Sequence, residues 1–138
     1  NTAEAIRAQV APPEKFSTIY SGIDFDLLDV VVDRTEKCRQ LGLDPQQPVV
    51  GMVGRLSPQK APLDFVAAAK LVLQQRPHTQ FVLVGDGPLT AEVVQAVGDE
   101  ARIKVLGYRD DVPEIYGILT IFALASRSFS PTCSRRLV

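Results

Sequence analysis

The stretch VVGMVGRLSPQK, which runs from Val49 to Lys60, changes character halfway along. Its first half is apolar with only glycine interruptions, a pattern typical of a β-strand that is buried on both faces of a sheet. Its second half holds Arg55 and Lys60 around a turn that contains a glycine, a serine and a proline. The sequence therefore predicts a buried strand over 48–54 that ends in two cations.

Further apolar runs follow this strand, and single helical segments separate them. The clearest helix spans 62–75, because a proline suits its first position and apolar side chains recur with helical spacing. The side chains expected on its buried face are Phe65, Ala68, Ala69, Val72 and Leu73. The other expected elements are helices over 2–10, 36–41, 90–97 and 112–116, the last three adjoined by Gly42, Gly98 and Asp111 as caps, a β-prone run over 15–24, and strands over 79–87, 102–108 and 118–126.

This alternation of strands and helices defines the expected fold class. Strands so apolar, separated by single helices, favour an α/β protein with a Rossmann-like, doubly wound parallel sheet covered on both faces. The crossovers between its strands are expected to be right-handed. In such a sheet, ligands bind at the carboxyl ends of the strands.

Composition and charge narrow the classes of protein. The chain has 138 residues, of which 46% are hydrophobic and 22% charged, and its net charge is −1, so we expect one globular domain and no nucleic-acid partner. No apolar run reaches the roughly 18 residues that a membrane span needs, so no integral membrane segment is expected. Cys38 and Cys133 lack CxxC spacing, which favours free thiols in a reducing, cytoplasmic compartment.

Residue types that serve in metal and nucleophilic chemistry are scarce. His78 is the only histidine, and its place beside Pro77 favours a surface turn. A two-histidine metal site is therefore excluded, and no convincing Ser/His/Asp arrangement is present. We expect neither a metal nor a catalytic residue in this chain.

The two cations after the first strand form the first candidate site. Arg55 offers a planar fork for phosphate oxygens, Lys60 offers a compact charge, and Gly54 lets a bulky group approach the backbone. The start of the helix at 62 adds backbone N–H groups and the positive end of the helix dipole. A diphosphate seat is one interpretation, and two solvated cations on a surface loop are the other.

The sequence VGDGP, at 84–88, is the second candidate site. Gly85, Asp86 and Gly87 resemble a glycine-rich phosphate loop but fit neither GxGxxG nor the Walker pattern. A tight turn that needs positive φ explains the glycines equally well. Asp86 is then either a turn residue or a contact for a ligand hydroxyl.

Three stretches together resemble the group 1 glycosyltransferases, the large retaining family built on the GT-B fold. They are VVGMVGRLSPQKAPLDFVAAAKLV, QFVLVGDGPL and IKVLGYRDDVPEIYGILTIFALAS, preceded by the shorter IYSGID at 19–24. The resemblance covers roughly 15–126 and implies the nucleotide-sugar-binding C-terminal half of that fold. It also implies that 1–14 belong to a missing acceptor-side half and that 127–138 form an atypical tail.

The resemblance implies roles for particular residues. Arg55 and Lys60 would grip the diphosphate of a UDP- or GDP-linked sugar and neutralise the departing nucleotide. The backbone of Lys104, Val105 and Leu106 would face the nucleobase. The family needs no metal cofactor, and its members transfer a sugar to an acceptor that this sequence does not identify.

Two departures from the family pattern bear on activity. Ala61 stands where family members commonly have glycine, and no acidic residue follows Glu114, although the family places a Glu-Gly…Glu motif after the last strand seen here. We therefore expect a truncated or frame-shifted piece of a hexosyltransferase that is inactive alone and whose parent is cytoplasmic or peripheral at the membrane. A non-enzymatic Rossmann-type nucleotide-binding or interaction module stays open as the alternative.

Overall fold

The computed structural model describes residues 12–15 and 30–127. The chain divides into two compact units, and the short 3-10 helix η1 (Pro13–Lys15) belongs to a different unit from all other elements, which lie within 26–128. The helix expected over 2–10, most of the run over 15–24, Cys133 and most of the tail over 127–138 lie outside the described residues.

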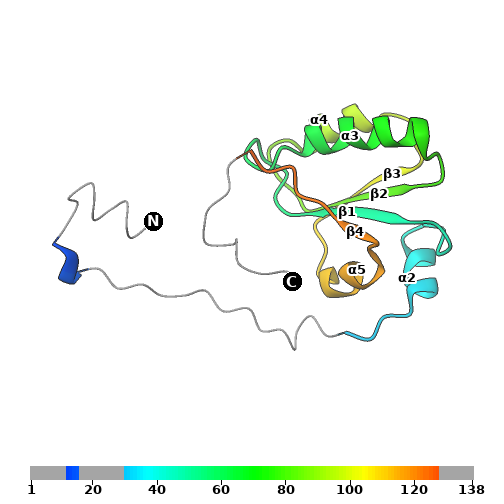
Figure 1. Ribbon diagram of the computed structural model, residues 1–138, viewed down its shortest axis with the longest axis horizontal. Coiled ribbons are helices and arrows are strands. Elements are labelled where there is room, and N and C mark those ends of the chain that lie inside the picture. Colours follow the sequence, from blue (N-terminus) through cyan, green and yellow to red (C-terminus); the bar gives the residue numbers. More distant parts are fainter. Residues whose placement is uncertain (1–11, 16–29, 128–138) are drawn as a thin grey trace. The chain divides into compact units, whose positions relative to one another are not determined.

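Four parallel strands form the sheet of the larger unit. They are β1 (Val49–Val53), β2 (Gln80–Val84), β3 (Ile103–Gly107) and β4 (Ile121–Phe122), in the order β3-β2-β1-β4 (Figure 1). Val53 pairs with Val84, and Val84 pairs with Gly107. The carboxyl ends of three strands are therefore level with one another.

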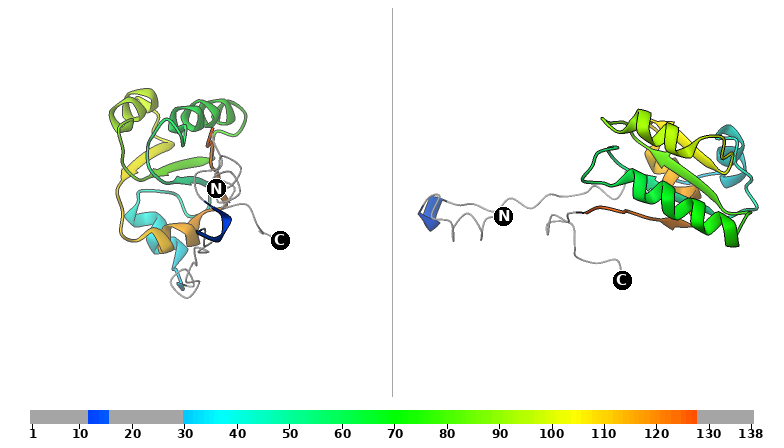
Figure 2. Two further views of the ribbon diagram at one scale, coloured as in Figure 1. Left: turned by 90° about the vertical axis from the view of Figure 1, so that its left-hand side faces the viewer. Right: turned by 90° about the horizontal axis from the view of Figure 1, so that it is seen from above.

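Helices cover both faces of this sheet. The helices α3 (Pro62–Gln75) and α4 (Thr90–Val97) lie on one face, and α2 (Arg34–Gln40) and α5 (Val112–Ile118) lie on the other (Figures 1 and 2). Strand β2 supplies both cores because alternate side chains point to opposite faces. Phe81 and Leu83 join the α3/α4 core, whereas Val82 and Val84 join the other. The expected doubly wound, Rossmann-like α/β fold is confirmed.

The predicted buried face of α3 was partly wrong. Phe65 and Ala69 are buried as expected, but Ala68 and Val72 are exposed and Val66 is buried instead. Both stripes have helical spacing and share Phe65 and Ala69, so periodicity does not separate them. Packing against the sheet selects the stripe that carries Val66.

The fourth strand was predicted too long. Ile118 ends α5 rather than beginning a strand, and β4 comprises only two residues. The side chains of Ile115 and Ile118 are three residues apart and fully buried in the same core, which favours one more helical turn. Strand β4 lies at the edge of the sheet, and Ile121 and Phe122 are exposed.

The helix caps were predicted with mixed success. Gly98 ends α4 as expected, whereas Leu41 rather than Gly42 is the C-cap of α2. Asp111 holds the N-cap position of α5, but its side chain makes no capping hydrogen bond. Its carboxylate is engaged by two cations instead, Lys37 and Arg109.

Candidate functional site

Three loops meet where β1, β2 and β3 end. They begin at Gly54, Gly85 and Tyr108, and backbone hydrogen bonds tie them together: Gly54 N donates to Val84 O over 2.9 Å, and Gly85 N donates to Gly107 O over 2.7 Å. Gly85 has a φ of +127°, and a Cβ there would lie 2.1 Å from Gly54 O. Position 85 must therefore be glycine.

A hollow of about 320 Å³ opens at this meeting point. Because apolar strand ends form its floor, it is predominantly apolar, with a few polar side chains beside them. Its lining residues are Val53, Gly54, Arg55, Val84, Gly85, Asp86, Tyr108, Arg109 and Val112. The structure thus brings the two predicted loops into one site and adds the loop after β3.

The loop that carries the two cations is anchored by Leu56. The Leu56 side chain is fully buried. The backbone N–H of Leu56 donates to Asp86 O over 3.0 Å, and the backbone carbonyl of Leu56 accepts from Leu89 N over 3.0 Å. A Cβ on Gly87 would lie 2.4 Å from Leu56 O, so the two loops are in direct backbone contact. Arg55 is exposed and Lys60 is half-buried, so neither cation is held inside the core.

Asp86 has a defined local role. Its Oδ1 accepts from Thr90 Oγ1 over 2.6 Å and from Gly87 N over 2.7 Å. These bonds, that from Thr90 first, hold the pKa of the Asp86 carboxyl below its usual value. Asp86 is therefore a turn residue at the start of α4, and its contact with a ligand hydroxyl stays a prediction.

The start of α3 contains a strained residue. Ala61 is the N-cap, it is 4% exposed, and among the described non-glycine residues only Ala61 has a positive φ, of 48°. In this left-handed region the Cβ of an L-residue lies too close to the following carbonyl oxygen, whereas glycine has no Cβ. Glycine at this position would avoid this strain.

Arg127 lies beside the same loop and was not singled out from the sequence. Its N–H donates to Gln59 O over 3.0 Å, and its guanidinium binds both carboxylate oxygens of Asp64, in the first turn of α3, at 3.0–3.1 Å. Both side chains are more than half exposed, so the pair contributes little stability. Assigning 127–138 to an atypical tail hid this contact.

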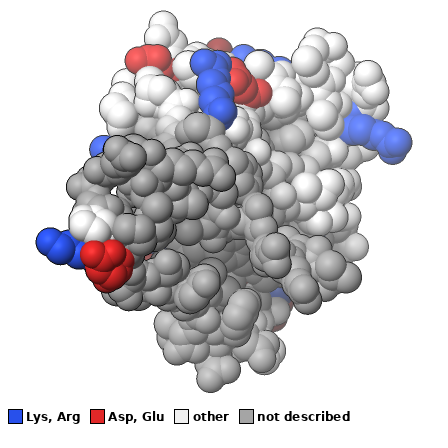
Figure 3. Space-filling view, turned by 60° about the vertical axis from the view of Figure 1, so that its left-hand side comes forward, with Lys and Arg blue, Asp and Glu red and all other residues white. Residues whose placement is uncertain are grey.

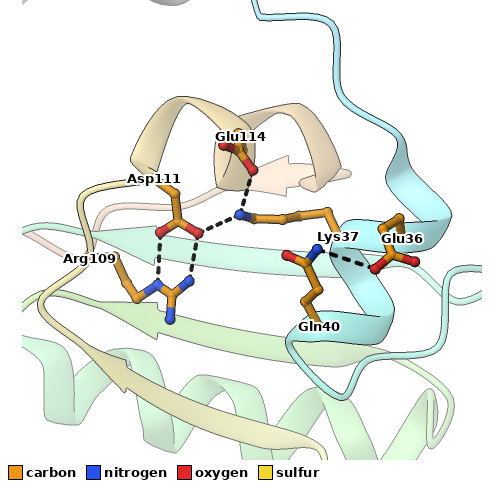
Figure 4. Close-up of polar contacts among 6 residues, drawn as sticks. All are labelled: Glu36, Lys37, Gln40, Arg109, Asp111 and Glu114. Carbon is orange, nitrogen blue, oxygen red and sulfur yellow. Dashed lines mark hydrogen bonds and ion pairs between the residues drawn. The ribbon is translucent and has the colours of Figure 1, made fainter.

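A network of charged residues adjoins the hollow (Figure 4). Arg109 donates from Nε and Nη2 to the two carboxylate oxygens of Asp111, over 2.8 and 2.6 Å. Lys37, from α2, donates to Asp111 Oδ2 and, over 2.5 Å, to Glu114 Oε2. The Lys37 side chain is 6% exposed, which makes it the buried centre of this network.

The protonation of the network is fixed by these contacts. The hydrogen bond from Arg109, together with Lys37, holds the pKa of Asp111 well below its usual value. Burial by itself lowers the pKa of Lys37, but the bonds and charges of Asp111 and Glu114 outweigh burial, so its pKa is raised. Lys37, Arg109 and Asp111 are consequently all charged near neutral pH.

The residues predicted to face a nucleobase lie deeper in the sheet. Lys104 is mid-strand, and a Cβ on Gly42 would meet its Nζ at 3.0 Å, whereas Val105 and Leu106 pack against opposite cores. None of the three lines the hollow, and Tyr108 and Arg109, just beyond the strand, do. The nucleobase role of Lys104, Val105 and Leu106 stays a prediction.

Charge and surface chemistry elsewhere are unremarkable. On the face shown in Figure 3 the described basic and acidic side chains are interspersed. His78 is exposed, as expected for a surface turn. Within 12–15 and 30–127, no three His, Cys, Asp or Glu side chains are grouped to hold a metal ion, and none of the helices has the length and apolar character of a membrane span.

The sheet and its helices define a Rossmann-like α/β domain, with a hollow at the carboxyl ends of three strands. Sequence comparison identifies the family. The model of the family described as Glycosyl transferases group 1 matches residues 47–135 of this chain. Because this match covers more than half of the chain, the protein belongs to the group 1 glycosyltransferases, as the resemblance implied.

Individual relatives agree with this family. The chain is 34% identical over 128 residues to the Escherichia coli UDP-Gal:alpha-D-GlcNAc-diphosphoundecaprenol alpha-1,3-galactosyltransferase, covering 88% of the chain and 33% of that enzyme. It spans about a third of the length of such curated relatives.

Solved structures have the same architecture. Anabaena Alr3699/HepE, in complex with UDP, is 29% identical with a TM-score of 0.76 over 94% of this chain and 37% of that one. The C-terminal domain of a group 1 protein, LpcC, from Francisella tularensis has a TM-score of 0.60 at 23% identity, over 79% of this chain and 61% of that one. The second likeness concerns the fold alone, which is half of the GT-B architecture.

Proposed function

We propose that this chain binds the nucleoside diphosphate part of a sugar donor at the carboxyl ends of β1, β2 and β3. The observation that carries the proposal is that the loops 54–61 and 85–88 are in direct backbone contact. Leu56 is hydrogen-bonded to the second loop, and Gly85 packs closely against the Gly54 carbonyl. The hollow that the two loops share lies at the sheet edge where α/β proteins bind ligands.

In this proposal Arg55 and Lys60 bind the diphosphate. Both follow the end of β1 in a loop held at Leu56, and Lys60 precedes the start of α3 by two residues. The helix dipole favours an anion at that point. As the glycosidic bond breaks, the two cations stabilise the charge that develops on the departing nucleotide.

The nucleobase is then placed in the apolar hollow. Tyr108 and Arg109 line this hollow, and both an aromatic ring and a guanidinium plane can stack on a planar base. We favour a UDP-linked donor because the HepE neighbours, at 29–30% identity, were solved with UDP and UDP-glucose. The positive charge for the diphosphate comes from side chains, so no metal is required.

The complete reaction is proposed for a longer protein, a retaining hexosyltransferase of GT-B type. Relatives are about three times as long as this chain, and residues 115–138 contain no carboxylate that could hold the donor sugar. The 138-residue chain is therefore expected to bind nucleotide without transferring sugar.

Titration calorimetry with UDP tests this proposal. Wild-type chain is expected to bind, and Arg55→Ala and Lys60→Ala are each expected to weaken binding about tenfold or more, the effect of losing one charge-assisted hydrogen bond. Lys70→Ala, which removes an exposed cation from the outer part of α3, is the control. Equal affinity of wild type, Arg55→Ala and Lys60→Ala would refute the phosphate assignment.

A further inference from the structure

We propose that Lys37 and Asp111 are positioning residues that hold the Arg109 guanidinium in a fixed orientation at the nucleotide site. This inference rests on the proposed function, because it concerns the same hollow. Arg109 contributes to the wall of that hollow, whereas Lys37, on α2, does not line it.

The contacts link three side chains in series, from Lys37 through Asp111 to Arg109. Asp111 binds Arg109 through both carboxylate oxygens, at 2.8 and 2.6 Å, and this two-point contact fixes the plane of the guanidinium. Lys37 donates to Asp111 Oδ2, the oxygen that also accepts from Arg109 Nη2. The carboxylate that orients Arg109 is thus itself held by Lys37, which reaches it from α2 (Figure 4).

The burial of Lys37 also calls for a reason. An ammonium group loses hydration when it is buried, and an apolar side chain of similar volume commonly serves stability as well or better. A simple tie between α2 and α5 would need no cation. A cation at this position can instead hold the Asp111 carboxylate in the orientation that Arg109 requires.

Two neighbouring ion pairs, Lys37–Glu114 and Arg39–Glu36, provide controls that distinguish a positioning role of Lys37 from general support of the fold. Glu114 binds Lys37 and is more exposed than Asp111, and among the described residues it makes no hydrogen bond or ion pair with Arg109, although its charge acts on Arg109 through space. Loss of the Glu114 charge should therefore weaken nucleotide binding less than loss of the Lys37 charge does. Arg39, an exposed cation on the same helix that pairs with Glu36, provides a matched control for removing positive charge from α2.

The experiment is a double-mutant cycle on UDP affinity, measured by calorimetry on the 138-residue chain. Lys37→Met nearly keeps the length of the side chain and removes its charge. We expect it to weaken UDP binding about threefold to tenfold, which lies in the lower half of the couplings found within one hydrogen-bond network. In the Arg109→Ala background, Lys37→Met should have no further effect. Lys37→Arg should restore most of the affinity, Glu114→Gln should weaken binding less than Lys37→Met does, and Arg39→Met should leave the affinity unchanged.

A second measurement works without ligand. In ¹⁵N spectra, the Nε–H signal of Arg109 should exchange slowly with water in the wild type and faster in Lys37→Met and in Asp111→Asn. If Lys37→Met does not fold at low temperature, Lys37→Gln and Asp111→Asn take its place in both measurements.

The outcomes distinguish the two proposals. Equal loss of affinity with and without Arg109, or an unchanged Arg109 signal in Lys37→Met, would overturn the positioning role. If Arg55→Ala and Lys60→Ala weaken UDP binding but Lys37→Met does not, positioning fails and the proposed function stands. If the wild type does not bind UDP, the proposed function and the positioning role both fail.

Discussion

Gly85 crosses Gly54 so closely that a Cβ on Gly85 would lie 2.1 Å from the Gly54 carbonyl oxygen. This contact joins the ends of two neighbouring parallel strands and brings the cationic loop beside the glycine-rich loop. It makes the site a property of the sheet rather than of either loop alone.

Replacement of Gly85 is expected to damage both the fold and the site. Gly85→Ala adds a backbone clash to an unfavourable φ of +127°, and we expect it to lower the free energy of unfolding by about 3 kcal/mol or more. Gly54→Ala is the matched comparison, because its φ is also positive, at +150°, but nothing lies within 4 Å of the added Cβ. Urea unfolding of the two variants should show a clearly smaller loss for Gly54→Ala, and equal losses would contradict the close crossing.

Ala61→Gly is expected to stabilise the protein. It relieves a left-handed residue, at a φ of 48°, although glycine gives the unfolded chain more freedom. The net gain should be about 0.5–1 kcal/mol in the free energy of unfolding, since strain of this kind is worth about 1–2 kcal/mol. Ala68→Gly, at an exposed and regular position of α3, should instead destabilise by about 1 kcal/mol. A loss of stability in Ala61→Gly would show that the site carries no strain.

Stability is expected to fall in acid because of Asp111. The pKa of Asp111 is lowered in the folded state, chiefly by Arg109, so its contribution is present above the unfolded value of about 3.9 and is lost as pH falls toward the folded one. Asp111→Asn should lower the free energy of unfolding at pH 7 by about 1–3 kcal/mol and flatten its decline below pH 4. Unfolding curves between pH 7 and 2.5 would measure both effects.

The same network predicts that the stability of the fold also falls at alkaline pH, because of Lys37. The pKa of Lys37 is raised in the folded state, so its contribution is present below the unfolded value of about 10.4 and is lost as pH rises through the folded one. Lys37→Met should remove this loss of stability above pH 10. The same slope in wild type and Lys37→Met would assign the alkaline effect to other groups.

The edge of the sheet is expected to promote self-association. Ile121 and Phe122 in β4 are 55% and 44% exposed, and such an edge can pair with another chain. Ile121→Lys should reduce the aggregation rate, followed by light scattering, with a change in stability within about 0.5 kcal/mol. Phe122 is less suitable for this test, because its ring packs edge to face on the ring of Tyr116, with the two ring centroids 5.4 Å apart. An unchanged aggregation rate would show that association uses another surface.

Sequence patterns located most elements but not all of their faces and ends. The bounds of α3 and α4 were predicted as observed, because proline, glycine and helical spacing mark them locally. The burial of Val66 and the helical state of Ile118 were missed, because each depends on what the residue packs against. The glycine-rich loop was recognised, but its reason, contact with Gly54 and Leu56, required the neighbouring strand.

The order of strands and helices, the fold class and the cationic loop were determined by the sequence alone, since they depend on patterns within about ten residues. Tertiary structure decided the contacts between distant segments. Lys37 meets Asp111 across 74 positions, and Arg127 meets Asp64 across 63. Such pairs form only when the crossovers place separate helices and strands side by side, and no local pattern of either partner encodes that placement.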